Sequence, residues 1–466
     1  MVRNFKGALM PEARVLDVFR RSLLETHKGA RAMLLRINPA KLLVFGYVFY
    51  MLIGWALLSL PFMQNVPVRQ IDNLFTAVSA VSTTGLVTVD PGSTYNIWGQ
   101  IVLLLLIQAG GVGYMTIGSF AMLATHERLI PIRERVTMAA FSLPNGSSPA
   151  QFIRTVILFT LICELVGAIA LYAIFASEGI SNPVWSAIFH SVSAFCTAGF
   201  SLNSNSFEGL AGHPGLNFVI SALSLFGAMG FLIIWDIWRN LTGRSVYLGF
   251  TSKLIIRMTA AFLLIGTIIL FVAEPSIAAL DPLDRLLAAF FQTMSASTTV
   301  GFNTVPIGAL SHATLLVMFF LMAIGASPSG TGGGIKTTSF AAMVGLVRST
   351  LKQRAHVRLF KRRIAASRLQ AAGATFFYFM ILLTLAMFLL SLTEPGASFE
   401  VMVFECISAL GTVGISMGLT GDLSVLGKLI IIILMTAGRV GILSFGIAFA
   451  MHDETPAEEA DNELLL

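Results

Sequence analysis

The most constraining feature of this chain is a short stretch that occurs four times. The copies begin with phenylalanine at positions 75, 189, 291 and 404. With each phenylalanine counted as position zero, every copy has Ser at four, Ala at five, Thr at eight, Gly at ten and a large apolar residue at eleven. The glycines at 85, 199, 301 and 414 are 114, 102 and 113 residues apart. Such recurrence indicates one supersecondary unit used four times.

Each copy predicts a short apolar helix that ends in Thr-x-Gly. About ten helical residues are too few to cross a bilayer core of about 30 Å, so this helix would stop inside the membrane. The negative end of its dipole favours a cation there, and the glycine permits a backbone whose carbonyls replace the water shell of an ion. We therefore predict a cation filter made of Thr83, Thr84, Gly85, Thr197, Ala198, Gly199, Thr299, Val300, Gly301, Thr412, Val413 and Gly414. A duplicated core helix with a glycine cap and no pore is the alternative, but such a cap does not require the threonine.

Composition favours a membrane protein, because 56% of the 466 residues are apolar and only 12% are charged. We predict an all-α membrane protein of four tandem units, each with a long helix, a re-entrant short helix, Thr-x-Gly and a second long helix. Eight transmembrane helices would then surround one central pore. The expected units are residues 42–124, 125–239, 240–350 and 351–450, between a cytoplasmic segment 1–41 and an acidic cytoplasmic tail 451–466. The second long helices of units two and four are expected at 216–238 and 425–450.

The distribution of charge predicts the orientation. Nine Lys and Arg residues lie in 1–41, and eight lie in 348–368 without an acid. By the positive-inside rule these segments are cytoplasmic, as are both termini of a multi-pass protein of the cytoplasmic membrane. The opposite segments carry ten acids against Arg69 and Arg285, which predicts an acidic mouth that concentrates cations. We expect the basic run to contact anionic lipid or a protein partner, and we expect no nucleic-acid partner.

The second long helix of unit three is interrupted. Six of the fourteen residues in 325–338 are Gly or Pro, which a continuous helix does not tolerate. The segment is not a phosphate-binding loop, because Ile335 separates Gly334 from Lys336. We expect a mobile gate below the filter, with a simple kink as the alternative. The gate residues would be Gly325, Ser327, Ser329, Gly330, Thr331, Gly332, Gly333, Gly334, Lys336 and Arg439.

Arg439 enters this list because an arginine in the middle of an apolar helix is a functional candidate. Either it pairs with helix-end carbonyls and loop oxygens, such as those of Ser327, Ser329 and Thr331, or it acts directly in permeation. Glu164 is interpreted as a helix–helix hydrogen-bonding residue, with an ion-coupling site as the alternative. We assign no role to His190 and Glu405.

We do not expect an enzyme or a cofactor in this chain. No nucleophile–base pair or metal-ligand cluster is recognisable in the sequence. Its three cysteines, Cys163, Cys196 and Cys406, lie in apolar stretches without metal-site spacing.

The four filters, the glycine-broken sixth helix and Gly438-Arg439-Val440-Gly441 together resemble the Trk/Ktr/HKT superfamily of potassium transporters. The resemblance spans about 42–450, and Thr299-Val300-Gly301 and Thr412-Val413-Gly414 match the first letters of the potassium-channel filter. The chain looks most like the Ktr-type membrane subunit. The resemblance implies potassium uptake, a homodimer, and docking on a cytosolic ring of nucleotide-binding regulatory subunits, so that nucleotide binds only the partner. Segments 1–41, 239–253 and 348–368 and the tail are the expected contacts.

Two departures from the family pattern bear on these expectations. Thr197 replaces a frequent Asn, which changes little if the carbonyl coordinates the ion. Ile442 replaces a frequent Pro, so the family's bend in the last helix is not predicted here. The alternative functions are a sodium-selective or sodium-coupled transporter of the same architecture and a non-transporting membrane sensor or scaffold. Plant relatives that resemble this pattern and carry sodium have Ser at the first filter glycine, whereas this chain has Gly85.

Overall fold

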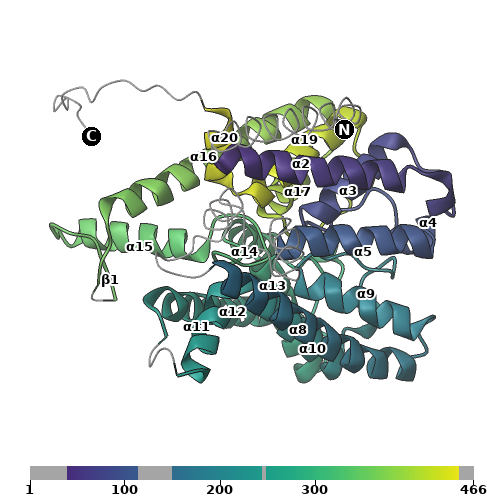
Figure 1. Cartoon of the computed structure of the whole chain (residues 1–466), viewed down its shortest axis with the longest axis horizontal. Coiled ribbons are helices and arrows are strands. Elements are labelled where there is room, and N and C mark those ends of the chain that lie inside the picture. The colour runs from purple at the N-terminus through teal and green to yellow at the C-terminus, as the bar shows by residue number, and fades with distance from the viewer. Residues whose placement is uncertain (1–38, 114–148, 244–247, 361, 451–466) are drawn as a thin grey trace, which may run out of the picture.

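The structure is a computed structural model that describes residues 39–113, 149–243, 248–360 and 362–450. Most of the predicted segment 1–41, the cytoplasmic segment after unit one and the acidic tail lie outside the described residues. The described part is helical, apart from one two-stranded hairpin. In Figure 1, α2 (Pro39–Leu58) and α5 (Ile97–Val112) run along the long axis of the molecule.

In the part of the chain that the structure describes, four helices are long and apolar enough to cross a membrane: α2, α8 (Pro149–Ser177), α12 (Phe250–Ala273) and α16 (Ala366–Thr393). Each precedes one copy of the repeat and contacts the short helix of that copy. The short helices are α3 (Gln70–Val81), α9 (Pro183–Phe195), α13 (Pro282–Thr298) and α17 (Phe399–Gly411). Apolar side chains such as Leu165 and Leu264 remain exposed on the long helices, which suits surfaces that face lipid.

The helices that follow the repeats are not straight, which corrects our prediction of continuous helices at 216–238 and 425–450. Helix α10 (Pro214–Ala228) meets α11 (Phe231–Leu241) at 89°, and α19 (Val425–Val440) meets α20 (Ile442–Phe449) at 105°. Counting each bent pair as one span gives up to six spans in the described residues. The bends lie at Gly230 and Gly441, whose φ values of 91° and 98° end a right-handed helix. A bend therefore exists beside Ile442 without a proline.

In units one, two and four, a glycine three residues before the break lets the second helix pack closely against the short helix of the same unit. Gly110, Gly227 and Gly438 lie against the carbonyl oxygens of Val81, Phe195 and Leu410, which all occupy position six of the repeat. An added Cβ would lie less than 3.0 Å from each oxygen, so only glycine fits. In unit one the described helix likewise ends at Val112, before Gly113 with φ 92°. In unit three, α14 (His312–Ala323) is separated from α15 (Thr337–Leu351) by an irregular loop.

The hairpin is the exception to the predicted all-α fold. Strand β1 (Arg358–Leu359) pairs antiparallel with β2 (Arg362–Arg363). The side chains of Leu359 and Ile364 lie over Gly345 of α15, where the missing side chain leaves room. In Figure 1, α15 and β1 project at the end of the molecule opposite α4 (Pro91–Thr94).

The helix after each repeat also contacts the short helix of the following unit. These contacts are α5 with α9, α10 with α13, α14 with α17, and α19 with α3. The last contact returns to the first unit, so the series is closed. It includes an ion pair of 2.6 Å between Lys428 of α19 and Asp72 of α3, both nearly inaccessible to solvent. Four small elements complete the described chain: η1 (Pro61–Met63), η2 (Glu208–Leu210), η3 (Ile307–Ala309) and α18 (Leu419–Asp422).

Candidate cation-binding site

The repeated Ser, Ala and Thr end the four short helices in the same way. The amide of each position-eight threonine donates to the alanine carbonyl at position five, at 3.1 Å for Thr83, Thr197 and Thr412 and 3.4 Å for Thr299. The next amide donates to the serine carbonyl at position four, at 2.8–3.1 Å. These bonds require a left-handed threonine, and the four φ values are 50–61°. For a β-branched residue this conformation is an outlier.

The four repeated glycines form a closed ring with neighbouring carbonyls. Their φ values are 66–93°. An added Cβ would lie less than 3.0 Å from the position-nine carbonyl oxygen of the next unit. The pairs are Gly85 with Ala198, Gly199 with Val300, Gly301 with Val413, and Gly414 with Thr84. The structure thus brings all twelve residues of the predicted filter together, and the glycines permit this approach of one backbone to the next.

The side chains of the position-four serines form hydrogen bonds with the Thr-x-Gly segments or with the residue that follows each segment. The hydroxyls of Ser79 and Ser408 accept hydrogen bonds of 3.1 Å from the amides of Gly85 and Gly414. The hydroxyls of Ser193 and Ser295 instead donate to the carbonyls of Phe200 and Phe302, at 2.8 and 2.5 Å. Each segment is therefore fixed to the helix that precedes it.

A cavity of about 350 Å³ opens on one side of the glycine ring, and all four glycines line it. Only Asp90 and Glu208 of the ten acids that we expected at the mouth line this cavity. Asp72 is neutralised by Lys428, a cation that the sequence analysis did not count on this side. Glu274 and Glu394 accept hydrogen bonds of 3.0 Å from the amides of Ser311 and Ser424, which begin α14 and α19. The acidic lining beside the ring is thus smaller than expected, because only two of the ten acids line the cavity and Asp72 is paired with a lysine.

The loop between α14 and α15 lies against the other side of the ring. The Thr83 hydroxyl donates to the Thr331 carbonyl at 3.2 Å, and the Thr197 and Thr331 hydroxyls are 2.9 Å apart. The Gly333 amide donates to the Thr412 hydroxyl at 2.8 Å. Gly332 lies so close to the hydroxyl of Thr299 that a side chain would not fit. Three successive loop residues therefore touch the position-eight threonines of all four units.

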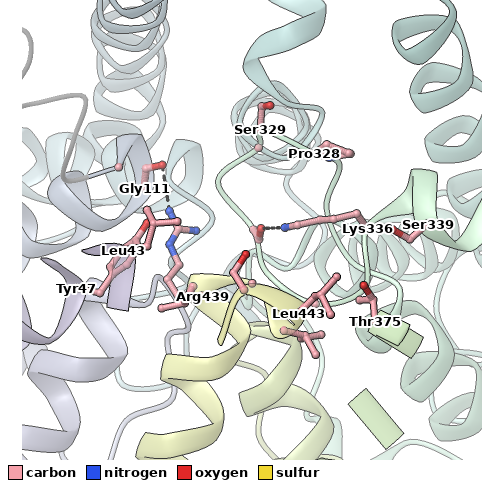
Figure 2. A pocket seen from close by; sticks show the side chains of 18 of the residues that line it. Leu43, Tyr47, Gly111, Pro328, Ser329, Lys336, Ser339, Thr375, Arg439 and Leu443 are labelled. Carbon is pink, nitrogen blue, oxygen red and sulfur yellow. Dashed lines mark hydrogen bonds between the residues drawn. The ribbon is translucent and has the colours of Figure 1, made fainter. Parts of the chain in front are cut away.

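Two cations, Arg439 and Lys336, hold this loop, and Figure 2 shows where both lie. Arg439 donates to the carbonyls of Thr331 and Gly110 and to the Thr83 hydroxyl at 3.0 Å. Its hydrogen bond of 3.2 Å to the Gly111 carbonyl is visible in Figure 2. From the other side, the Lys336 ammonium donates to the carbonyls of Gly332 and Gly333, at 2.6 and 3.3 Å. Both cations line a cavity of about 290 Å³.

The loop serines contact other partners than Arg439. The Ser327 hydroxyl lies 3.1 Å from that of Thr337, and the Ser329 carbonyl accepts from the Phe231 amide at 3.0 Å. The pairing expected for Arg439 therefore involves the Thr331 backbone and helix-end carbonyls rather than the Ser327 and Ser329 hydroxyls.

Sequence reasoning missed a set of polar residues at position one of the repeat. Glu405 accepts from the Ser416 hydroxyl, from the Met417 amide at 3.1 Å and from the Thr420 hydroxyl at 2.6 Å. In the other units, Nε2 of His190 accepts from the Leu202 amide at 3.3 Å, and the Gln292 amide donates to Thr304 at 3.2 Å. All three side chains are buried and brace the segment that follows the filter. The signal available was that position one is polar in every copy.

Glu164 forms the helix–helix contact that we expected. Its carboxylate accepts a hydrogen bond of 3.3 Å from Gln108, which joins α8 to α5. The Cys196 thiol lies beside the same carboxylate, at 3.9 Å. In the described residues, no group of three or more His, Cys, Asp or Glu side chains is placed to hold a metal ion. The donors that converge on the ring are carbonyl and hydroxyl oxygens, which suit a hard cation.

Comparison with known proteins places this geometry among cation transporters. A family model described as TrkH, cation transport protein, matches residues 56–459. The chain is 34% identical over 430 residues to the Ktr system potassium uptake protein B of Vibrio alginolyticus, covering 91% of this chain and 94% of the relative. It is 33% identical over 435 residues to the protein of that name from Bacillus subtilis (strain 168), covering 92% and 97%.

Two further matches extend this comparison. The potassium/sodium uptake protein NtpJ of Enterococcus hirae is 34% identical over 438 residues, covering 91% of this chain and 95% of the relative. The crystal structure of the potassium transporter TrkH from Vibrio parahaemolyticus superposes with a TM-score of 0.68 at 21% identity, covering 87% of this chain and 84% of that one. At this identity the superposition speaks for the fold alone.

Proposed function

Because the chain belongs to the TrkH family of cation transport proteins, we propose that it takes up potassium across the cytoplasmic membrane through its ring of four Thr-x-Gly segments. The observation that supports this proposal is that each repeated glycine lies against the position-nine carbonyl of the next unit, and that the four contacts close into a ring. Carbonyl oxygens held in a ring replace the hydration shell of a potassium ion. Because the backbones meet without side chains between them, the ring cannot collapse easily onto a smaller ion.

The proposed architecture is four units, 42–124, 125–239, 240–350 and 351–450, with eight membrane crossings around one pore. The closed series of contacts between second helices and the following short helices supports it. A span that bends at a glycine inside the membrane still counts as one crossing in this proposal. The charge distribution supports cytoplasmic termini, because the hairpin arginines lie at the end of the molecule opposite the cavity of the glycine ring.

The loop from Gly325 to Lys336 is the proposed gate. Its contacts with all four position-eight threonines support a closed arrangement, in which Thr331, Gly332 and Gly333 occupy the path below the ring. Irregular backbone at this depth is tolerated only beside a cavity or buried in protein. Arg439 and Lys336 would hold the closed loop, and their charges would add an electrostatic barrier to a cation.

The proposed assembly is a homodimer that docks on a cytosolic ring of nucleotide-binding regulatory subunits and contacts membrane lipid. The resemblance to Ktr-type membrane subunits supports it. Nucleotide would bind the partner only, and this chain would need no cofactor of its own besides the transported ion. Sodium remains a second candidate ion, because one relative is named a potassium/sodium uptake protein.

Ion flux into liposomes tests the proposal, with potassium, rubidium and sodium compared. Gly85→Ser and Gly414→Ser should each lower the ratio of potassium to sodium flux roughly tenfold, equivalent to about 1.4 kcal/mol of preference. A side chain at either glycine meets a carbonyl of the neighbouring unit and strains a backbone with positive φ.

Gly373→Ser is the matched control, because a Cβ at Gly373 meets nothing within 4 Å. The flux ratio is a property of folded molecules, so poor expression of a variant does not obscure it. An unchanged ratio in both filter variants would refute the four-segment filter, and a parent that prefers sodium would favour the second candidate ion.

A further inference from the structure

A small basic pocket lies at the beginning of α12, between this helix and the β1–β2 hairpin. Its volume is about 200 Å³, and three cations line it: Lys253 and Arg257 of α12 and Arg362 of β2. The remaining lining residues are apolar and include Phe250 and Phe360. Among the described residues no acid lines the pocket, and the cationic side chains lie over an apolar floor.

The two guanidinium groups are positioned by a reciprocal pair of aromatic contacts. Arg257 of the helix lies 4.8 Å from the ring centroid of Phe360 in the hairpin. Arg362 of the hairpin lies 5.2 Å from that of Phe250 in the helix. Neither arginine forms an ion pair with a carboxylate of the described residues. The aromatic rings therefore orient both cations and leave their charge available to an anion.

The hairpin that supplies Arg362 is itself anchored. The Ile364 amide donates to the Val357 carbonyl at 3.0 Å, and the Arg358 amide donates to the Ser349 hydroxyl of α15 at 3.3 Å. Asp236, the carboxylate nearest in sequence to the start of α12, is already engaged by the Gly249 amide at 3.0 Å and the Ser252 hydroxyl at 2.6 Å. The pocket is thus preformed, and this acid is bound to the first turn of the helix.

The helix face that bears the two pocket cations continues as an apolar stripe. Lys253 and Arg257 are followed at helical spacing by Leu264 and Ile268, which are 63% and 54% exposed. Because α12 is long and apolar enough to cross a membrane, this stripe would face lipid chains and the pocket would lie at the level of the headgroups. The occupant should therefore combine an anionic head with apolar chains.

We propose that this pocket binds the phosphate of an anionic phospholipid, with the acyl chains along the Leu264 and Ile268 face of α12. Arginine forks match phosphate oxygens, and basic pockets at the cytoplasmic ends of membrane helices suit such headgroups. Phe250 and Leu254 also line a larger cavity, of about 640 Å³, that extends to Pro328 and Lys336 of the loop. A bound lipid would lie against Phe250 and Leu254, which also line the cavity that reaches the proposed gate. The inference rests on the proposed membrane location of α12 but not on ion permeation.

Binding of phosphatidylglycerol to the purified full-length protein tests the proposal, for example by native mass spectrometry. The triple variant Lys253→Gln, Arg257→Gln, Arg362→Gln should weaken binding roughly tenfold or more, because it removes every cation that lines the pocket beside the lipid phosphate. The control variant Arg348→Gln, Lys352→Gln, Arg354→Gln removes the same charge from the end of α15 and the turn after it, and should change binding less than threefold. All six side chains lie at the surface, so both proteins should fold.

Three results would overturn the proposal. Equal weakening by both triple variants would mean unspecific attraction to a basic surface. Binding of inorganic phosphate that depends on the pocket, without such dependence for phosphatidylglycerol, would assign the site to a free phosphate. Loss of cytosolic partner binding with unchanged lipid binding would assign it to protein docking. Because lipid binding is measured without a gradient, it is independent of whether the protein conducts potassium.

Discussion

At the scale of single residues, the site depends on threonines held in a conformation that they rarely adopt. Four of the nine described non-glycine residues with positive φ are the position-eight threonines. Each such backbone costs about 1–3 kcal/mol and persists only where its surroundings impose it. Here the imposed geometry follows from two backbone hydrogen bonds at the end of each short helix. In this conformation the threonine hydroxyl points toward the loop between α14 and α15. The position-nine carbonyl and the position-ten glycine of the same segment then lie in the ring.

Glu405 should matter to this arrangement although it touches no filter residue. In Glu405→Ala, the Met417 amide and the Ser416 and Thr420 hydroxyls lose their acceptor. An orphaned buried donor costs about 1–3 kcal/mol, so we expect a lower unfolding temperature and a reduced potassium preference. Thermal unfolding in detergent and the liposome flux ratio measure these effects.

The neighbouring substitution Glu400→Ala serves as the control, because Glu400 lies on the same helix and contacts only the exposed His312 among the described ion pairs. If Glu405→Ala behaved like Glu400→Ala in both measurements, the bracing role would be wrong.

The repeat predicted that the four Thr-x-Gly segments share one structure, and they do, because identical residues make identical backbone contacts in them. Ser, Thr and Gly recur since the helix end and the close backbone approach admit few alternatives. Position one was not recognised as part of the repeat, and His190 and Glu405 were given no role, because Thr76, His190, Gln292 and Glu405 share a capacity for hydrogen bonding rather than a chemical identity. Their partners also differ from unit to unit, so no single spacing reveals them.

At the scale of elements, the irregular loop between α14 and α15 is the part best suited to move. Its observed position depends largely on polar contacts, of Thr331 and Gly333 in particular, although Ile335 is packed in the core, and glycine allows its backbone to adopt another path. A difference of a few kcal/mol between two arrangements is within the range that a bound regulator can shift.

Removing residues 330–333 should therefore raise rubidium flux and reduce its dependence on a regulatory partner. Arg439→Ala should act in the same direction with a smaller effect, roughly tenfold for about 1.4 kcal/mol lost from the closed state. Rubidium uptake into vesicles at matched protein levels measures both. Arg239→Ala, which removes a cation from the last turn of α11, is the control.

A loop-shortened protein that folds, keeps its selectivity and conducts no faster than the parent would reduce the loop to a structural kink.

The breaks in the second helices of units two and four were not predicted from the sequence. Length and apolarity predicted continuous spans, and these criteria cannot detect a bend. The usable signal was spacing, since a glycine three residues before the break recurs as Gly110, Gly227 and Gly438. Sequence alone could not show that these glycines meet the position-six carbonyls, because that contact belongs to the packing of two helices.

At the scale of the whole molecule, unit four closes onto unit one through a buried ion pair. Asp72 and Lys428 are separated by 356 residues, and their contact lies between α3 and α19. The sequence predicted four units around one pore but not the ion pair between the first and the last, because a pairing across that separation leaves no local pattern.

Lys428→Met should destabilise the protein by about 3–5 kcal/mol, because it leaves the Asp72 carboxylate buried without its partner. Adding Asp72→Asn should recover much of that loss. Unfolding temperatures in detergent report both effects, with the exposed His312–Glu400 pair as a comparison whose removal should change little. Equal stability of Lys428→Met and the parent would show that unit closure does not depend on the ion pair.

The closed order of glycines and carbonyls has a consequence for symmetry. All four segments of the ring belong to one polypeptide, so a mutation can change one segment and leave the other three unchanged. The contributing residues are already unequal, since the carbonyls come from Thr84, Ala198, Val300 and Val413 and only Thr84 carries a hydroxyl, bonded to Ser82 at 2.6 Å. An ion bound in the proposed filter would therefore meet carbonyls of four different residues. Unlike a channel of four identical chains, this protein can have its coordination adjusted in single steps, one side at a time.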